Sequence, residues 1–508
     1  MTGPTGASEA APGPQPGDGR GSLPGGLALL VPVLVAAVAL AGVALRAPDR
    51  VPAAPTARSA PVDARTVTCF TLPGSRAASG LVVGTVDVPG PRGEVGAARV
   101  GVPGVVEPDL SLDAVGGWAT ATLPGSRSGS VDLEARGGAA PGLVAYGAVR
   151  APDDLGGGLA VQQCAEPARR WWFVGAGSTA ARGGAVVLHA PDDAGAVVDV
   201  VVRGEQGVLA SAGGEDVRVG AGATEVLPLD ELAAGASDVA VDVDASQGQV
   251  VAAVADTWGE GLEPEGTDWV PASTEPARAV VVPGVVDTGS TPVLVVANGG
   301  SRTVVARPSL LSEAGRVAPP DADSVRVPAG GVATVRLPRE LDETGAVEVR
   351  ADGPVTASVR IGADDDVAHP SGAAPLDEAA VLPVDLGAPV DTDVGLRLGV
   401  LLVDPDSQRV RTRGVRLTGF DADGAEVAAG SVRLGAGTAL DVDLAEVLGV
   451  PARDLGDLAY VLVDATARDA VGAPLVGAAV VEAESGIAVQ PLRPLVPEVS
   501  VPALVPGL

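Results

Sequence analysis

The side chains able to act as acids, bases or nucleophiles are few and scattered along this chain. Its only histidines, His189 and His369, stand far apart, and His189 lies within an apolar run without a nucleophile near it in the sequence. Neither an H-x-x-x-H pair nor a G-x-S-x-G elbow is present. The sequence therefore predicts no catalytic residue and a non-enzymatic protein. A hydrolase would need two carboxylates converging in a cleft, which sequence spacing does not reveal.

Two motifs resemble cofactor or metal loops. Residues 174–180 contain a G-x-G-x-x-A sequence, but Arg182-Gly-Gly and a valine-rich run follow it, where a dinucleotide site would need a helix to begin. A glycine-rich hairpin loop is the preferred interpretation. Residues 421–426 and 364–366 carry clustered carboxylates without the full ligand pattern of a calcium loop, and solvated turns are expected there. We predict no metal and no cofactor.

Tryptophans are the remaining candidates for ligand contact. Trp171 and Trp172 adjoin Phe173, and Trp258 and Trp269 flank an acidic loop rich in glycine and proline. Exposed rings of this kind stack on sugars, so these four residues are possible ligand-contact aromatics. Packing in the core or between modules is the preferred interpretation, because adjacent strand residues face opposite ways.

The two cysteines, Cys69 and Cys164, form the only possible internal pair. A disulfide would close a loop of about 95 residues and stabilise the fold by on the order of 4–5 kcal/mol. Such a bond suits an oxidising compartment. Nothing nearby completes the four ligands of a zinc site. We predict a Cys69–Cys164 disulfide, with two unconnected buried thiols as the alternative.

Composition excludes one class of partner. The formal net charge is −30, which disfavours binding to nucleic acid phosphates. Valine, alanine and leucine dominate, while aromatic residues make up 2% of the chain. Valine-rich runs interrupted by glycine and proline favour strands over helices.

The amino-terminal residues predict the compartment. Residues 1–22 read as a disordered cytoplasmic tail, residues 23–45 contain no charge and are long enough to cross a bilayer, and residues 46–66 form an Ala/Pro-rich linker. We expect a single-pass membrane protein whose large carboxy-terminal part is extracytoplasmic. A signal peptide cleaved near Ala41, giving a secreted protein, is the alternative.

The rest of the chain is a repeat of short alternating strands, which predicts an all-β protein of tandem immunoglobulin-like β-sandwich modules. A β-propeller-like arrangement is the alternative. The modules are expected at 67–168, 169–277, 278–378 and 379–490, followed by a Pro-rich tail at 491–508.

Three further local features are predicted within these modules: a repeated turn, two short helical turns and one hairpin. A Val-Arg-x-x-Ala-Gly sequence begins at Val217, Val325 and Val432 and places a turn glycine after a short strand. Short helical turns are expected at Leu229 and Leu444. The Asp-Gly pair at 352–353 predicts a hairpin between two closing strands.

The order of these features resembles an actinobacterial family of membrane-anchored extracytoplasmic proteins, the domain-of-unknown-function family DUF5719. The resemblance rests on Cys69, on Cys164 followed by 172–177 (WFVGAG), on the Asp-rich turn at 191–193, on 269–273 (WVPAS) and on 280–284 (VVVPG), and it would span about 67–490. The opening motif departs from the family's commoner Cys-Pro-Gly-Pro.

The resemblance implies one amino-terminal membrane segment, no assigned activity and no catalytic residue. Family genes often accompany a large membrane glycosyltransferase, which implies an envelope protein of that kind as a partner. Together these features predict a membrane-anchored scaffold or binding protein of the cell envelope. An array of carbohydrate-binding modules acting on envelope glycan is the alternative.

Overall fold

The computed structural model describes most of the chain beyond residue 57. It describes residues 58–88, 98–99, 111–112, 114–125, 129–180, 182–209, 213–260, 263–320, 322–339, 341, 344–363, 366–387, 390–400, 412–465 and 474–501. Residues 59–499 form one compact unit, and the architecture below is that of this unit. The expected tail at 1–22, the span at 23–45 and most of the linker at 46–66 lie outside the described residues.

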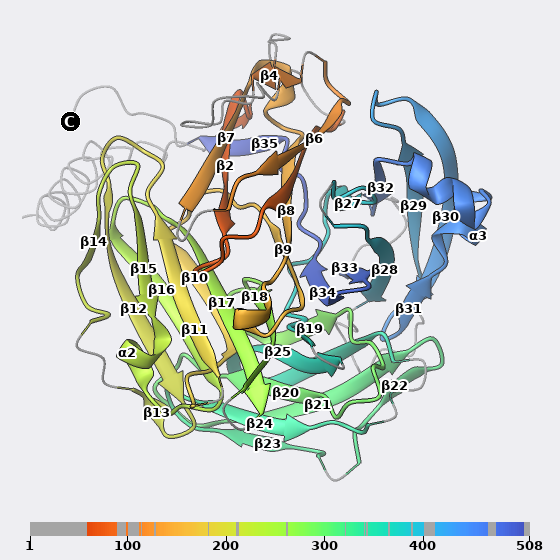
Figure 1. The fold of residues 1–508 in the computed structure, drawn as a ribbon. Helices are drawn as coiled ribbons and strands as arrows, with labels where there is room; N and C mark the ends of the chain where they lie inside the picture. The colour runs from red at the N-terminus through yellow and green to blue at the C-terminus, as the bar shows by residue number, and fades with distance from the viewer. Residues whose placement is uncertain are drawn as a thin grey trace, which may run out of the picture. The chain divides into compact units, whose positions relative to one another are not determined.

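Strands dominate the described residues, so the all-β prediction is confirmed (Figure 1). The strands are β1 (Arg58–Pro61), β2 (Ala64–Thr71), β3 (Ser79–Thr85), β4 (Ala98–Arg99), β5 (Ser111–Leu112), β6 (Trp118–Leu123), β7 (Gly129–Arg136), β8 (Leu143–Arg150), β9 (Leu159–Gln163), β10 (Arg170–Ala176), β11 (Gly183–His189), β12 (Ala196–Gly204), β13 (Gly207–Val208), β14 (Val217–Val219), β15 (Thr224–Pro228), β16 (Val239–Gln247), β17 (Val251–Glu260), β18 (Glu263–Val270), β19 (Ala277–Pro283), β20 (Val293–Ala297), β21 (Val304–Ser312), β22 (Gly315–Val317), β23 (Val325–Val327), β24 (Val332–Arg336), β25 (Ala346–Ala363), β26 (Asp366–Ala368), β27 (Ala380–Pro383), β28 (Asp393–Val400), β29 (Thr412–Phe420), β30 (Glu426–Gly435), β31 (Ala439–Val442), β32 (Tyr460–Asp464), β33 (Leu475–Ala483), β34 (Gly486–Pro491) and β35 (Glu498–Val501).

The helices are short. The two predicted helical turns are confirmed as α2 (Leu229–Ala233) and α3 (Leu444–Leu448), and 3-10 turns occur at η1 (Gly137–Ala139), η2 (Asp153–Leu155) and η3 (Ala452–Asp457). The Asp443 carboxylate caps α3 by accepting from the backbone N–H of Glu446. None of the helices in the described part of the chain has both the length and the apolar character needed to cross a bilayer.

Two of the expected modules each contribute strands to two sheets. In 169–277 one sheet has the order β10-β16-β12-β13, with β14 also on β12, and the other has the order β15-β11-β17-β18. Segment 379–490 repeats this arrangement as β27-β32-β29-β30 and β31-β28-β33-β34. Segment 67–168 supplies β2-β7, β6-β3-β8-β9 and the short pair β4-β5, and the strands of 278–378 are connected through the long β25, which pairs with β19, β20, β21 and β26. In 169–277 and 379–490 the chain therefore alternates between two sheets. The module boundaries stay a prediction.

The hairpin predicted at Asp352-Gly353 is wrong. The flanking residues form the continuous strand β25, whose first half pairs with β19 and β21 while its second half pairs with β20 and β26. The two halves satisfy their backbone groups in different sheets and have no ladder with each other. The crossing at Gly353 is tight, because a Cβ there would lie 2.5 Å from Val304 Cγ1. An Asp-Gly pair marks a bend but does not select the partner strands.

The repeated turn glycines have the predicted conformation. Gly222, Gly330 and Gly437, which end the three Val-Arg-x-x-Ala-Gly sequences, have φ values of 62°, 64° and 80°. A side chain is strained in this left-handed region, whereas glycine is not. The shared sequence therefore reflects a shared backbone turn.

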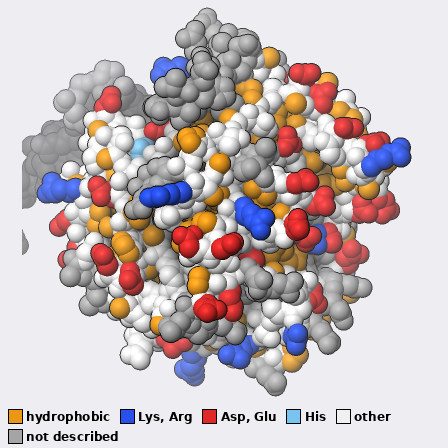
Figure 2. All heavy atoms as spheres, in the orientation of Figure 1, with side chains coloured by type: hydrophobic (Ala, Val, Ile, Leu, Met, Phe, Trp, Pro, Cys, Tyr) orange, Lys and Arg blue, Asp and Glu red, His pale blue; other side chains and the backbone are white. Residues whose placement is uncertain are grey.

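Alternation along the strands builds the cores. In β12, Val198, Val200 and Val202 point inward and are buried, while Asp199 between them faces outward. Each sheet pair encloses a cluster of valine, leucine and alanine side chains, and smaller apolar clusters join sheets of neighbouring segments. Acidic side chains are spread over the face in Figure 2, which fits the net charge of −30.

Four edge strands meet at the centre of the unit. β9, β18, β26 and β34 each end a sheet, and β9 and β26 both contact β18 and β34. In Figure 1 the sheets are arranged around this centre. Among the described strands no ladder joins these four. Their inner backbone groups must therefore find other partners.

Candidate functional site

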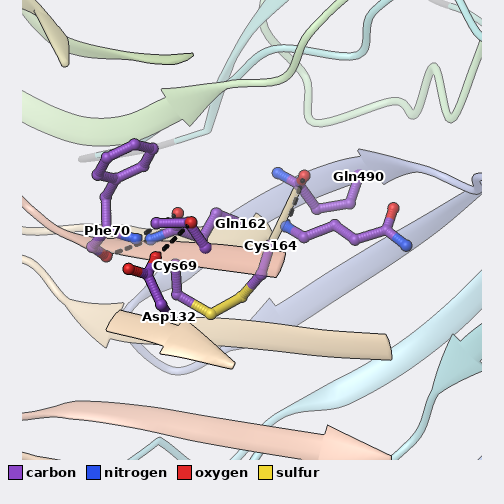
Figure 3. The surroundings of a disulfide bond; sticks show 8 residues. Cys69, Phe70, Asp132, Gln162, Cys164 and Gln490 are labelled. Carbon is purple, nitrogen blue, oxygen red and sulfur yellow. Dashed lines mark hydrogen bonds between the residues drawn. A yellow bond between two sulfur atoms is a disulfide. The ribbon is translucent and has the colours of Figure 1, made fainter. Parts of the chain in front are cut away.

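The predicted disulfide between Cys69 and Cys164 is confirmed, with Cα atoms 4.5 Å apart (Figure 3). It joins β2 to the residue that follows β9. Beside it, Thr68 and Ala165 exchange backbone hydrogen bonds of 2.8 and 3.1 Å. The Gln162 side-chain amide bonds to both backbone groups of Phe70. The disulfide thus holds the first strand of this segment against the connection into β10.

Three of the four candidate tryptophans are buried. Trp171, Trp172 and Trp269 are 9%, 4% and 2% exposed. Trp171 donates from Nε1 to the Val250 carbonyl at 2.9 Å, and the Trp269 ring lies 6.3 Å from that of Phe70. These rings pack within or between sheets and form no open stacking face. Their predicted role in ligand contact stays a prediction.

Trp258 is half-buried and lies among charges. Its ring is 4.0 Å from the guanidinium of Arg360 and 5.2 Å from that of Arg182. Cations placed over an indole face are attracted by its quadrupole. Of the four candidates, Trp258 keeps a partly accessible ring, and its inner contacts lead to the main charge network of the unit.

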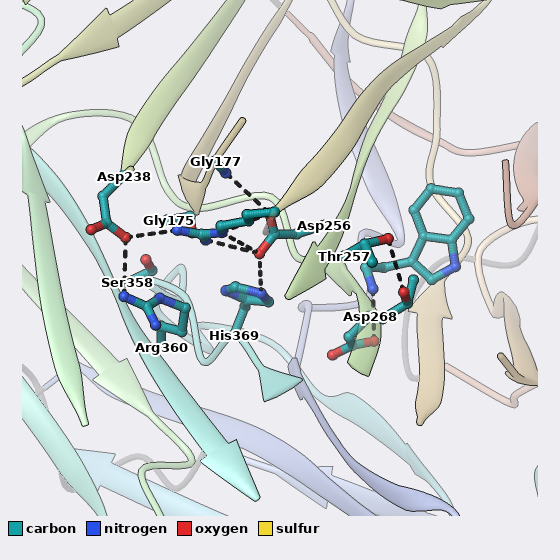
Figure 4. A network of polar contacts seen from close by, with 12 residues as sticks. Gly175, Gly177, Asp238, Asp256, Thr257, Asp268, Ser358, Arg360 and His369 are labelled. Carbon is teal, nitrogen blue, oxygen red and sulfur yellow. Dashed lines mark hydrogen bonds and ion pairs between the residues drawn. The ribbon is translucent and has the colours of Figure 1, made fainter. Parts of the chain in front are cut away.

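This network is centred on Asp256 of β17, which is fully buried (Figure 4). Arg182 donates to both of its oxygens, from Nε at 3.1 Å and from Nη2 at 2.8 Å. The backbone N–H of Gly177 donates at 3.0 Å, and His369 Nε2 lies 3.2 Å away. Burial by itself would raise the pKa of Asp256, but Arg182 and His369 outweigh it and lower that pKa to about 2.

The network also explains the glycine motif at 174–180. No helix begins there; β10 ends at Ala176, β11 begins at Gly183, and the two strands belong to different sheets. The preferred hairpin interpretation is therefore wrong. A dinucleotide site is still disfavoured, because no helix begins directly after this loop. The loop instead places Gly177 and Arg182 beside Asp256. Its glycines let the backbone come close enough to donate a hydrogen bond to the Asp256 carboxylate.

Removing Arg182 should strongly destabilise the protein. Arg182→Ala leaves Asp256 buried without its main partner, and we expect a loss of about 3–5 kcal/mol in the free energy of unfolding by urea titration. Arg170→Ala is the matched control, because the Arg170–Asp244 pair is exposed and its loss should cost at most about 1 kcal/mol. Equal effects of the two substitutions would contradict a structural role for the network.

Two further buried aspartates lie at the centre. Asp366 of β26 accepts through Oδ2 from the backbone N–H groups of Leu159 and Ile487, at 3.1 and 2.8 Å. Asp268 of β18 accepts from the Val161 N–H at 3.1 Å. These carboxylates supply acceptors to β9 and β34, which among the described strands no ladder joins to β18 or β26. Side chains thus replace the missing β pairing between the four edge strands.

Both carboxylates prefer their neutral form. Burial raises the pKa of Asp366 to about 7, and its backbone hydrogen bonds offset this only in part. Burial and the nearby Asp366 raise the pKa of Asp268 as well. One oxygen of each, Asp366 Oδ1 and Asp268 Oδ2, has no hydrogen-bond partner among the described residues. Ionisation of either group would place a poorly solvated charge at the centre.

The stability of the protein should therefore depend on pH in a defined direction. The pKa of Asp366 is about 7 in the folded protein against an ordinary 3.8, so its ionisation favours unfolding. The free energy of unfolding should fall as the pH rises from about 4 to about 7, by up to about 4 kcal/mol from this group, and then level off. Asp366→Asn should remove this part of the slope in urea titrations. The exposed Asp423→Asn is the control, and an unchanged slope in Asp366→Asn would contradict the assignment.

An open cavity of about 310 Å³ lies where connecting segments gather. Its walls come from the start of β10 and from the chain after β18, after β26 and after β34. The lining residues with charged or aromatic side chains are Arg170, Trp171, Trp172, Glu275 and Arg493. Burial lowers the pKa of the Arg493 guanidinium below its usual value, and that residue also lines a neighbouring cavity of about 30 Å³. A polar ligand would here meet charges of both signs.

A second cavity, of about 510 Å³, surrounds the β33–β34 turn. Asp366, Glu482 and Glu484 line it. In the described part of the chain, no three His, Cys, Asp or Glu residues are grouped so as to hold a metal ion. At 421–426 the Asp421 carboxylate accepts from the N–H groups of Asp423 and Ala425 and so closes its own turn. Residues 364 and 365 lie outside the described residues.

A family model called "Family of unknown function (DUF5719)" matches residues 119–445. The chain belongs to this family. The match runs from within β6 into α3, so it is shorter than the expected 67–490; it includes Cys164 and leaves Cys69 outside. No curated protein and no solved structure matches the chain.

Proposed function

We propose that this DUF5719 protein is a membrane-anchored, extracytoplasmic binding protein of the cell envelope that acts as a scaffold. The uncharged segment at 23–45 and the disulfide support an exported, anchored chain. The two sheets formed by 169–277, and again by 379–490, support tandem immunoglobulin-like modules. A secreted form remains the alternative to the anchored one.

The observation that carries this proposal is the cavity of about 310 Å³. Its lining residues are contributed by segments more than 300 residues apart in the chain, and most of them lie beside strands that are tied together at the centre. A concave site on rigid elements is what a binding protein needs for a preformed contact surface. The partner that fits the proposal is an envelope protein, such as a membrane glycosyltransferase, presenting a polar segment.

Photo-crosslinking in intact membranes tests this proposal. A benzophenone amino acid at Ala374, an exposed residue lining the cavity, should give a discrete crosslinked species containing a membrane-embedded envelope protein. The same probe at Val317, which is exposed but outside the cavity, should not give that species. Identical products from both positions, or none from Ala374, would contradict a partner at the cavity.

Binding of envelope glycan is the second candidate, and Trp258 favours it. Its ring is half-buried, and the Arg360 guanidinium lies 4.0 Å from the ring centre, so the ring is held in place and is partly accessible. An aromatic face with adjacent guanidinium donors suits a sugar ring with hydroxyl or carboxylate substituents.

Glycan-array binding should reveal this second function. Trp258→Ala should weaken any specific signal by roughly 30-fold, equivalent to about 2 kcal/mol, as expected for an aromatic residue at the centre of a contact. Trp258→Phe should retain most of the binding because the flat ring remains. Binding that survives Trp258→Ala, or an array without signal, would remove the glycan candidate.

A further inference from the structure

The fold brings three side chains to His189 that the sequence keeps apart. His189 ends β11, and Thr224 lies opposite it on β15. Ser130 and Asp132 are two residues apart on β7, and their side chains both reach the imidazole. His189 Nε2 lies 3.0 Å from Asp132 Oδ2, and Nδ1 lies 3.1 Å from Ser130 Oγ. The sequence places no nucleophile near His189, but the fold brings two hydroxyl groups to its imidazole.

The carboxylate of this group is oriented and ionised. Thr68 donates from Oγ1 to Asp132 Oδ1 at 2.6 Å, which leaves Oδ2 for His189. Burial by itself would raise the pKa of Asp132, but the hydrogen bonds from His189 and Thr68 outweigh it and lower that pKa. An ionised carboxylate only accepts, so the His189 hydrogen lies on Nε2 and the Nδ1 lone pair faces the hydroxyls.

Two hydroxyls share that lone pair. Thr224 Oγ1 lies 3.0 Å from His189 Nδ1 and 3.0 Å from Ser130 Oγ. Nδ1 accepts one proton, so one hydroxyl donates to it and the other donates to the first hydroxyl. Ser130 is the less hindered alcohol, because Thr224 carries a methyl group on the same carbon. Ser130 is thus the oxygen better able to attack an electrophile.

This group is accessible, unlike the other histidine of the chain. His189 is 2% exposed, but Ser130 and Thr224 are partly exposed and the Asp132 side chain is 24% exposed. His369 is fully buried, and neither ring nitrogen has a hydroxyl within hydrogen-bond distance among the described residues. The base at 189 is therefore sheltered while its hydroxyl partners lie at the protein surface.

We propose that Ser130 is an activated nucleophile, with His189 as its base and Asp132 as the positioning residue, and that it accepts acyl groups from small uncharged esters. This goes beyond the binding function proposed above. The relay from hydroxyl to imidazole to carboxylate has the order of groups that activates serine in acyl transfer, with the two ring nitrogens exchanged, so that Nδ1 faces the hydroxyl and Nε2 the carboxylate. Asp132 and the net charge of −30 disfavour an anionic substrate.

The reaction balances with these groups and water alone. Ser130 Oγ forms a bond to the ester carbonyl carbon and passes its proton to His189 Nδ1. The bond to the leaving alcohol breaks, and that alcohol takes the proton from Nδ1. Water then attacks the acyl-serine and gives a proton to Nδ1, which returns it to Ser130 as the carboxylic acid leaves.

An uncharged fluorophosphonate probe tests the proposal on the full-length protein in detergent. Attack by Ser130 forms a phosphorus–oxygen bond and expels fluoride, and mass spectrometry of peptides locates the modified residue. Ser130 should react on the order of 100-fold faster than Ser246, an exposed serine whose hydroxyl donates to the Val197 backbone carbonyl. Modification of Thr224 instead, or equal rates at Ser130 and Ser246, would overturn the proposal.

Variants separate chemistry from structure. His189→Gln and Asp132→Asn should each slow the labelling of Ser130 at least tenfold while thermal unfolding remains cooperative, because both replacements retain hydrogen-bonding groups. Asp132→Glu should restore part of the rate, and Thr224→Val should leave most of it. Labelling that is independent of His189 would overturn the role of the base even if Ser130 is modified.

Discussion

The central constraint on this structure is that four edge strands meet without pairing. β9, β18, β26 and β34 approach one another as the last strands of their sheets, and backbone groups left there without partners would cost free energy. Asp366 and Asp268 resolve part of this problem by accepting from strand N–H groups. Small residues make room for them: a Cβ on Gly486 would lie 1.8 Å from Asp366 Oδ2. Burial at this position favours the neutral form of both carboxyl groups, and it therefore raises their pKa values.

The charge network at Asp256 works on the opposite principle. There the carboxylate is ionised and buried, and Arg182 supplies a bidentate partner at the same depth. Asp238 connects Arg182 to Arg360 of β25, so the network crosses between strands that belong to different segments. Cores made of valine, alanine and leucine provide no directional contact of this kind. Polar groups therefore help to fix the position of one segment relative to the next.

The two proposed functional features use different parts of the architecture. The cavity lined by the connecting segments depends on the central packing, because its walls come from several sheets. The Ser130–His189 contact depends on the approach of β7 to β11 and β15. Both arise where elements distant in sequence meet, which is where binding and reactive groups converge in folded proteins. The unit thus positions candidate binding residues at the cavity and candidate reactive residues at His189, in two separate places.

Local properties of the chain were predictable from the sequence. The period-two pattern identified strands such as β12 and β16, the Val-Arg-x-x-Ala-Gly sequences identified the positive-φ turns, and the two cysteines allowed a single bond. These depend on neighbouring residues or on elimination. The partners of each strand were not predictable, and the Asp352-Gly353 hairpin failed for that reason.

The surroundings of the candidate residues were likewise decided by tertiary structure. Ser130 and Asp132 carried one signal in the sequence, their spacing of two on an alternating strand, which places both on one face. That His189 and Thr224 lie opposite them depends on how two sheets approach, and this is determined by packing over the whole unit. The sequence by itself determined which residues form strands and turns. Only the tertiary structure decided which side chains meet. Contacts between sheets join residues that are far apart in the chain, and no periodic pattern in the sequence reports such contacts.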